Sequence, residues 1–347
     1  MADDRGNIRK LAGTLRENLA RCAKDPDVDS VHDTRTGTRR LQATLETLLR
    51  DLPPAAGDEA VEQTRAAATA LMRTLKKIRR AAGPVRDLDV HRKLVGKLTK
   101  RALGEKDEKQ DQSEEKERHA TLTDQPDVLE TPAAGLRLEG LARQADDLDA
   151  WLKHRRRVMA DAMQAQAGDL LGKLDKRVEE LEAALHGRVK RSRKKPPGVV
   201  ALDSFARLAM EMQHLDAGNL HDFRKGAKKA RYVAELAAQG DAQAQQVGAS
   251  LKKLQDEIGN WHDWLVLAEE ARTALGDEAE ELIGLLDAER EEHFVKAMKT
   301  AAKLRGRLMG EWLAASELVR RVRRRVAANG TMAGAGSAVK AAGETHG

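Results

Sequence analysis

The feature that most restricts how this chain can fold is an internal repeat. Residues 31–41 read VHDTRTGTRRL and residues 220–230 read LHDFRKGAKKA, so a His-Asp-x-Arg-x-Gly phrase followed by two basic residues occurs twice. A second phrase follows each copy, LKKIRRAAGPVRDLDV at residues 75–90 and LKKLQDEIGNWHDWLV at residues 251–266. Two phrases repeated in the same order indicate the duplication of a multi-helix unit. Two such units would most simply pack about a pseudo-twofold axis.

The composition favours helices over strands. Hydrophobic residues make up 41% of the 347 residues and charged residues 34%, whereas aromatic residues reach only 2%. Ala, Leu, Arg, Lys and Glu dominate, as in long helices packed on one another. We therefore expect an all-α fold, with two duplicated antiparallel helical bundles related by a pseudo-twofold axis around a central basic groove or channel.

Apolar residues spaced by three and four, together with stop signals, divide the chain into helical segments. Pro53-Pro54 and Gly83-Pro84 are expected to end two helices, and Gly168 or Gly172 to break another. The predicted helices cover residues 7–24, 29–52, 58–82, 86–103, 136–186, 199–215, 219–239, 241–258, 262–274, 277–306 and 310–327.

These segments predict the domain organisation. Residues 7–187 form the first helical repeat, which contains a charged insertion or linker at 104–135. A basic linker at 188–198 leads to the second helical repeat at 199–327. The Gly- and Ala-rich residues 328–347 are expected to form a disordered tail.

General features of the chain point to a cytoplasmic protein. The polar N-terminus lacks the apolar core of a signal peptide. No run approaches the 18 apolar residues that a membrane helix needs, so no membrane partner is expected. Cys22 is the only cysteine, which leaves no internal disulfide. The net charge is only +6, so a strong electrostatic field must come from local clusters.

Such clusters emerge when the repeated phrases are placed on a helix. In the first phrase, His32, Arg35 and Arg39 form a stripe opposite a leucine stripe. In the second, His221, Arg224, Lys225 and Lys228 gather on one face. A third basic face carries Arg73, Lys76 and Arg80, within a stretch from Arg73 to Arg86 that holds six basic residues and no acidic one. Side chains of one sign repel each other, and such a surface indicates an anion-binding field for which Arg and Lys suit phosphate.

Two features of the phrases have structural alternatives. His32 and His221 could be buried or capping histidines that pair with the neighbouring aspartates, but their repeated position beside arginine favours contact with a ligand. Asp87 and Asp263 follow glycines by four residues and are expected to cap or bridge helices.

Motifs of catalysis are missing from the sequence. The chain contains neither the metal-binding H-E-x-x-H pattern nor a G-x-S-x-G elbow. Residues 168–174 resemble a phosphate loop only superficially, because their spacing is one short and Leu174 replaces the Ser or Thr that would hold magnesium. We expect no catalytic residue, no metal ligand and no cofactor.

The two phrases together resemble the CHAD family, the conserved histidine α-helical domains. The resemblance covers roughly residues 7 to 327 and includes second copies of both phrases. It implies an all-helical protein with two related bundles around a basic cavity, which binds inorganic polyphosphate without catalysis and localises to polyphosphate granules. Because no E-x-E-x-K signature of the CYTH triphosphate-processing domain occurs, we expect the stand-alone form.

The resemblance also assigns the binding residues. These are His32, Arg35, Arg39, Arg40, Lys76 and Arg86 in the first copy, and His221, Arg224, Lys228, Lys229, Lys252 and His262 in the second. The helical projection adds Arg73, Arg80, Lys225 and Arg231. The copies differ where His262 replaces Arg86 and Leu265 replaces Asp89, so the second half need not contact the ligand as the first does.

The leading hypothesis is therefore a module that binds inorganic polyphosphate. One alternative is an enzyme that processes polyphosphate or nucleotide phosphates. A second is a nucleic-acid-binding or helical scaffold protein. The scarcity of aromatic platforms argues against binding of single strands, whereas contact with a duplex backbone remains open.

Overall fold

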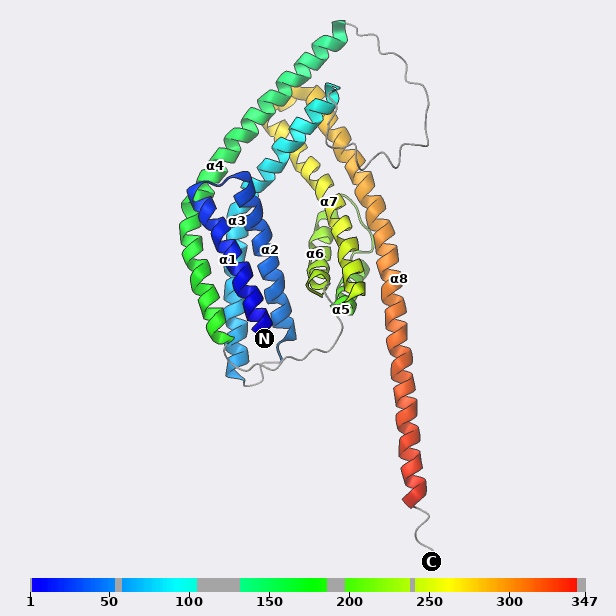
Figure 1. The fold of residues 1–347 in the computed structure, drawn as a ribbon. Helices are drawn as coiled ribbons and strands as arrows, with labels where there is room; N and C mark the ends of the chain where they lie inside the picture. Colours follow the sequence, from blue (N-terminus) through cyan, green and yellow to red (C-terminus); the bar gives the residue numbers. More distant parts are fainter. Residues whose placement is uncertain (1, 54–57, 105–131, 186–196, 238–240, 342–347) are drawn as a thin grey trace, which may run out of the picture. The chain divides into compact units, whose positions relative to one another are not determined.

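A computed structural model describes residues 2–53, 58–104, 132–185, 197–237 and 241–341 of the chain. Within these ranges the chain is all-helical and contains no strand, which confirms the predicted fold class. The elements, labelled in Figure 1, are α1 (Ala2–Lys24), α2 (Val28–Asp51), α3 (Glu59–Ala102), α4 (Pro132–Ala184), α5 (Pro197–Glu211), α6 (Leu220–Ala237), α7 (Ala242–Leu275), the 3-10 turn η1 (Gly276–Ala279) and α8 (Glu280–Ala341).

The helices form two compact units. Unit 1 comprises Met1–Arg193 and Ile258–Lys296, and unit 2 comprises Lys194–Glu257 and Ala297–Gly347. The division therefore falls inside the continuous helices α7 and α8. Residues 258–296, which lie in the predicted second repeat, belong to unit 1.

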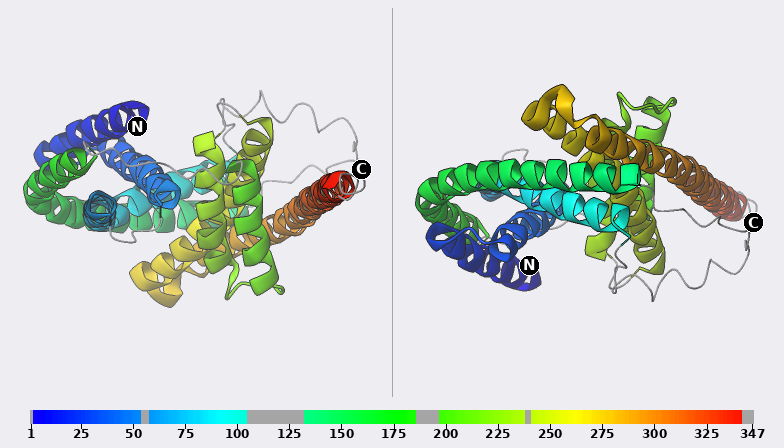
Figure 2. Two further views of the ribbon diagram at one scale, coloured as in Figure 1. Left: turned by 90° about the horizontal axis from the view of Figure 1, so that it is seen from below. Right: turned by 90° about the horizontal axis from the view of Figure 1, so that it is seen from above.

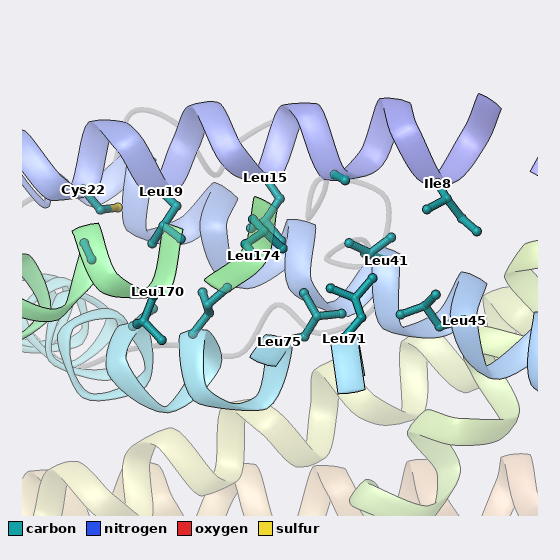
Figure 3. Packing of buried hydrophobic residues seen from close by; sticks show 14 of the residues in the cluster. Ile8, Leu15, Leu19, Cys22, Leu41, Leu45, Leu71, Leu75, Leu170 and Leu174 are labelled. Atoms are coloured by element: carbon teal, nitrogen blue, oxygen red, sulfur yellow. The ribbon is translucent and has the colours of Figure 1, made fainter. Parts of the chain in front are cut away.

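The first core of unit 1 is a four-helix bundle of α1 to α4. Helix α1 packs on α2 and α4, and α3 packs on the same two helices from the other side. Fully buried side chains such as Ile8, Leu41, Leu75 and Leu174 meet between the four helices (Figure 3). Burying a side chain of this size contributes roughly 1.5–3 kcal/mol, so the apolar stripes of the helices determine which faces meet.

A second core in unit 1 uses the other halves of α3 and α4. Leu88 and Val95 of α3 pack with Leu148 of α4, with Leu267 of α7 and with Leu286 of α8. Helices α3 and α4 run side by side through both cores (Figures 1 and 2). One pair of long helices thus joins two hydrophobic clusters.

Several predicted helix breaks are wrong. Helix α3 continues through Pro84, and α4 continues through Gly168 and Gly172. A proline inside a helix costs about 3 kcal/mol and a glycine about 1 kcal/mol. In α3 the positions on either side of the proline are buried, with Ala82 in the first core and Leu88 in the second. Packing on both sides of the proline therefore offsets the lost hydrogen bond.

Unit 2 is built from α5, α6, the first part of α7 and the later part of α8. Helix α5 packs on α6, where Phe205 and Phe223 meet edge to face with ring centroids 6.0 Å apart. Helix α8 is held by Trp312, whose indole Nε1 donates to Asp203 of α5 at 2.8 Å. Arg305 of α8 donates to the backbone carbonyl of Gln213 at 2.8 Å.

The predicted linkers and tail fall largely outside these elements. Residues 105–131 of the charged insertion and residues 186–196 of the basic linker lie outside the described residues. Helix α8 extends to Ala341, through residues for which the sequence predicts a disordered tail. No helix within the described ranges is both long enough and apolar enough to span a bilayer.

A buried ion pair lies at the junction of the two cores in unit 1. Arg156 of α4 donates through Nε to Asp89 Oδ1 of α3 at 2.6 Å and through Nη2 to the carbonyl of Pro26 at 2.9 Å. The Asp89 side chain is only 3% exposed, and its Oδ2 has no hydrogen-bond partner within the described residues. Arg156 is therefore the hydrogen-bonded partner of the carboxylate, and the charge of Arg92 also acts on it.

We predict that Arg156→Ala destabilises the protein by about 3–5 kcal/mol, because it leaves the Asp89 carboxylate buried and unpaired. Urea unfolding followed by circular dichroism measures the change. Arg157→Ala, at an exposed neighbouring position, should change stability by less than about 0.5 kcal/mol. Equal losses in the two variants would contradict this role of the pair.

Candidate functional site

The first repeated phrase lies on α2, and its contacts fix the register of α2 against α3. Arg35 Nη1 donates to the backbone carbonyl of Gly83 at 2.8 Å and to Asp87 Oδ1 at 2.6 Å. Further along the same seam, Arg79 donates to the side-chain oxygen of Gln42, and Arg65 donates to the carbonyl of Leu52 at 3.1 Å. The two helices are therefore antiparallel, and Asp87 bridges them, as predicted from its position after Gly83.

The glycine of each phrase marks a close approach to the preceding helix. A Cβ atom added at Gly37 would lie 3.3 Å from Leu15 Cδ1 of α1, and one added at Gly226 would lie 2.4 Å from Leu208 Cδ1 of α5. In both units the glycine thus faces one neighbouring helix while the arginine of the phrase bonds another. This packing gives a structural reason for two of the repeated residues.

The remaining basic residues of α2 and α3 form a second group, which points away from the core. Arg40 of α2 and Arg73, Lys76 and Arg80 of α3 are exposed, as is His32, and Arg86 is half-buried. The helical spacing of the three α3 residues places them on one face. We call this set the α2–α3 basic face; it consists of His32, Arg40, Arg73, Lys76, Arg80 and Arg86, of which Arg40 lies on the side of α2 away from the residues that contact α3. Within the described residues, none of the six side chains has an ion-pair partner.

The structure therefore separates the predicted residues of the first copy. Arg35 is only 19% exposed and is occupied by contacts to α3, so it holds the helices together. Arg39 is half-buried. The six residues of the α2–α3 basic face are the ones whose charge is available to a ligand.

The second phrase, on α6 in unit 2, is compensated to a greater extent. Arg224 Nε donates to the carbonyl of Gln255 in α7 at 3.1 Å, which parallels the bond of Arg35 to Gly83. Three predicted cations of this unit have carboxylate partners within one helical turn. The pairs are Lys225 with Asp222 at 2.9 Å, Arg231 with Glu235 at 3.0 Å, and Lys252 with Asp256 at 3.3 Å.

Other predicted residues of the second copy are distributed differently. Lys228 is half-buried and Lys229 is exposed on α6. His262 lies beyond the division within α7 and belongs to unit 1, where its ring centroid is 6.3 Å from that of Trp261. The predicted set of the second copy is therefore shared between the two units.

His221 is the histidine whose electrostatics respond most clearly to this arrangement. Burial lowers the pKa of His221 below its ordinary value, and the charges of Lys225 and Arg224 lower it further. Lys225 also lowers the pKa of Asp222, mainly through its hydrogen bond to this carboxylate, and thereby favours the charged form of the acid. Nearby negative charge from a ligand would favour the protonated form of His221.

Two further basic residues of α3 in unit 1 were not among the predicted site residues. Arg79 of α3 donates a hydrogen bond to the side chain of Gln42 in α2, and Lys77 is exposed on α3. Both lie in the stretch from Arg73 to Arg86 that contains no acidic residue, which was the available signal. Within the described ranges, no three His, Cys, Asp or Glu side chains are grouped as metal ligands would be.

Comparison with known proteins places the chain among helical domains of one family. The model of the CHAD domain matches residues 7–272. The chain is similar to the crystal structure of the CHAD domain from the plant Ricinus communis, with a TM-score of 0.54 and 19% identity over 86% of this chain and 88% of the other. It is also similar to PptA from Streptomyces chartreusis, with a TM-score of 0.48 and 15% identity over 86% and 98% of the two chains. No curated protein matches.

We predict that Arg35→Ala lowers stability by about 1.5–3 kcal/mol, the range for hydrogen bonds that involve a charged group. The exposed Asp87 contributes little of this, so the loss comes mainly from the bond to the Gly83 carbonyl. Arg40→Ala, in the same phrase but exposed, should cost less than about 0.5 kcal/mol. Urea denaturation of both variants measures the difference, and similar midpoints would show that Arg35 does not hold α2 on α3.

Proposed function

The chain belongs to the CHAD domain family, and from this premise we propose that it binds inorganic polyphosphate without acting on it chemically. The observation that carries the proposal is the α2–α3 basic face of unit 1. Its six side chains present one sign of charge, and none has an ion-pair partner within the described residues. A linear polyanion with no bases to read would be recognised by its charge density and by the spacing of its phosphates.

The physical advantage of polyphosphate over a small anion is the number of contacts. Each exposed Lys or Arg offers one or two charge-assisted hydrogen bonds, and each is weakened by solvent and salt. A chain that spans several of them adds their contributions and releases counterions as it binds. Orthophosphate can occupy only one or two of these positions, so its affinity should be far lower.

The two units would contribute unequally. In unit 1 the basic face is uncompensated, whereas in unit 2 Lys225, Arg231 and Lys252 already have carboxylate partners. A ligand at α6 must compete with those partners. We therefore place the main contacts of the chain on α2 and α3. We also propose that the two duplicated bundles are related by a pseudo-twofold axis and that a central basic channel binds the polyphosphate. We further propose that the protein is recruited to cytoplasmic polyphosphate granules.

A phosphate-processing enzyme is the first alternative. The exposed Asp33 and Asp87 follow His32 and Arg86 of the α2–α3 basic face in the sequence, but within the described residues neither belongs to a group of three His, Cys, Asp or Glu side chains that could hold a metal ion. Phosphoryl transfer in known enzymes depends on such metal binding. The face thus suits retention of phosphate better than its transfer. The enzyme would be favoured if the wild type released orthophosphate from polyphosphate in the presence of Mg²⁺ or Mn²⁺ and if the triple variant Arg73→Glu, Lys76→Glu, Arg80→Glu lost this activity.

We predict that the triple variant Arg73→Glu, Lys76→Glu, Arg80→Glu weakens binding of a long polyphosphate chain by at least about 100-fold. Losing two charged hydrogen bonds already removes roughly 3 kcal/mol, and the introduced carboxylates repel the ligand. Because all three positions are exposed, the far-ultraviolet circular dichroism spectrum should be unchanged. Titration by calorimetry at two salt concentrations measures both the affinity and its salt dependence.

The matched control is Lys10→Glu, Lys153→Glu, Arg157→Glu, which reverses the same number of exposed charges on α1 and α4. It should weaken binding by less than about fivefold through the change in net charge alone. Equal losses in the two triple variants, or equal affinity of the wild type for orthophosphate and a long chain, would overturn the proposal. Duplex DNA that competes as strongly as polyphosphate at the same salt concentration would favour the nucleic-acid alternative.

We further predict that the affinity for polyphosphate rises as the pH falls. In the free protein, burial and neighbouring cations lower the pKa of His221, so the folded state disfavours the protonated imidazole. The stability that the neutral imidazole contributes is therefore lost as the pH falls below about 6.5, the pKa of an unperturbed histidine. A bound polyanion compensates those cations and raises the pKa of His221, so binding takes up a proton. The affinity of the wild type should therefore rise between pH 8 and pH 5.5.

The control for this prediction is His221→Gln, which keeps a polar side chain but cannot titrate. Because the ligand also titrates, the pH dependence must be compared between the two proteins under identical conditions. A smaller rise in the variant than in the wild type is expected. Identical pH profiles would show that His221 does not sense the ligand.

A further inference from the structure

Unit 1 contains a cavity of about 560 Å³ at the end of α3, where the second core opens between α3, α7 and α8. It lies on the last three turns of α3, beyond the residues of the α2–α3 basic face. Its lining includes an apolar wall from Leu94, Leu98 and Trp264, and cations among which are Lys97 and Lys100. A cavity of this volume is typical of sites for small organic ligands.

Two acidic side chains line the cavity, Glu289 and Asp263, and neither is without a partner. Glu289 is only 8% exposed, and its Oε1 lies 2.7 Å from Arg101 Nη1. Its Oε2 lies 3.8 Å from His293 Nε2, one turn along α8. Because both carboxylates are engaged, a ligand that enters the cavity meets the remaining cations.

Lys97 and Lys100 are the cations left available. Both are exposed, and neither has an ion-pair partner within the described residues. They follow each other by three residues on α3, so their ammonium groups lie on the same side of the helix. The unpaired carbonyls at the C-terminus of α3 are equivalent to about half a negative charge. They therefore neutralise only part of the two positive charges that the lysines carry.

The apolar wall is fixed rather than adaptable. Trp264 is 5% exposed, and its ring stacks on His293 with centroids 5.9 Å apart and an interplanar angle of 19°. Leu98 is 6% exposed and belongs to the same hydrophobic cluster as Trp264. An apolar surface beside uncompensated ammonium groups matches a ligand with an apolar body and a charged end.

We infer that this cavity binds a small amphiphilic anion, that is, an organic carboxylate, sulfonate or phosphate with an apolar body. The inference is independent of the proposed function, because it concerns other residues and another ligand chemistry. Inorganic polyphosphate has no apolar part, so it would leave the Leu94, Leu98 and Trp264 wall unsatisfied. An apolar molecule without charge would likewise leave the lysines without a partner.

The probe that tests the inference is 1-anilinonaphthalene-8-sulfonate, which carries one sulfonate on an apolar ring system and fluoresces when it leaves water. The full-length wild type should enhance its fluorescence with a saturable isotherm. Lys97→Glu, Lys100→Glu should weaken this binding at least tenfold. The matched control Lys93→Glu, Lys153→Glu changes two exposed lysines outside the cavity and should weaken it less than twofold.

Two competitors then test the two halves of the ligand. Decanoate should displace the probe from the wild type, whereas pyrophosphate at the same concentration should not. Binding of long polyphosphate to the Lys97→Glu, Lys100→Glu variant should stay within about fivefold of the wild type, which separates this site from the α2–α3 basic face. The inference is overturned if the wild type shows no saturable enhancement, if both double variants lose binding equally, or if pyrophosphate displaces the probe as well as decanoate does.

Discussion

The pairing of α3 with α4 is the packing interaction on which the rest of unit 1 depends. These two helices supply side chains to both hydrophobic cores, and the Asp89–Arg156 pair joins them where one core gives way to the other. Helix α2 packs on the first half of α3 and there adds to a basic surface. Helices α7 and α8 pack beside the second half and there enclose the cavity. A single helix, α3, thus carries two chemically different surfaces on one rigid support.

Among the described residues of the chain, the basic ones fall into two classes: those paired with carboxylates and backbone carbonyls of the protein, and those without such partners. Arg35 and Arg156 are largely buried, and each donates to a backbone carbonyl as well as to a carboxylate. Such residues stabilise the contact between helices, and their removal leaves unsatisfied groups. The residues of the α2–α3 basic face are different, because they are mostly exposed and lack carboxylate partners within the described residues. Residue type alone therefore does not distinguish a structural arginine from a binding one.

Much of this could be predicted from the sequence, and the rest could not for physical reasons. Helical spacing correctly predicted the all-helical fold and the exposure of Arg73, Lys76 and Arg80. It could not show that Arg35 is held by Gly83, because a helical projection gives the face of a residue but not the register between two helices. The break expected at Pro84 was wrong because local propensity was outweighed by burial on both sides of the proline. The cavity beside Trp264 combines residues from three helices and leaves no pattern in any one of them.

The division of the chain inside α7 and α8 has a consequence for how the protein can be taken apart. Both helices begin in one unit and end in the other, so each unit contains segments that are separated in the chain. A fragment cut at the linker between the two predicted repeats would deprive the second core of its Leu267 and Leu286 side chains while leaving the α1–α4 core complete. Helix formation is cooperative along each of these segments, which couples the order of one unit to that of the other. The stretch that the repeated phrases delimit and the stretch that packs into one compact unit are therefore different parts of the chain.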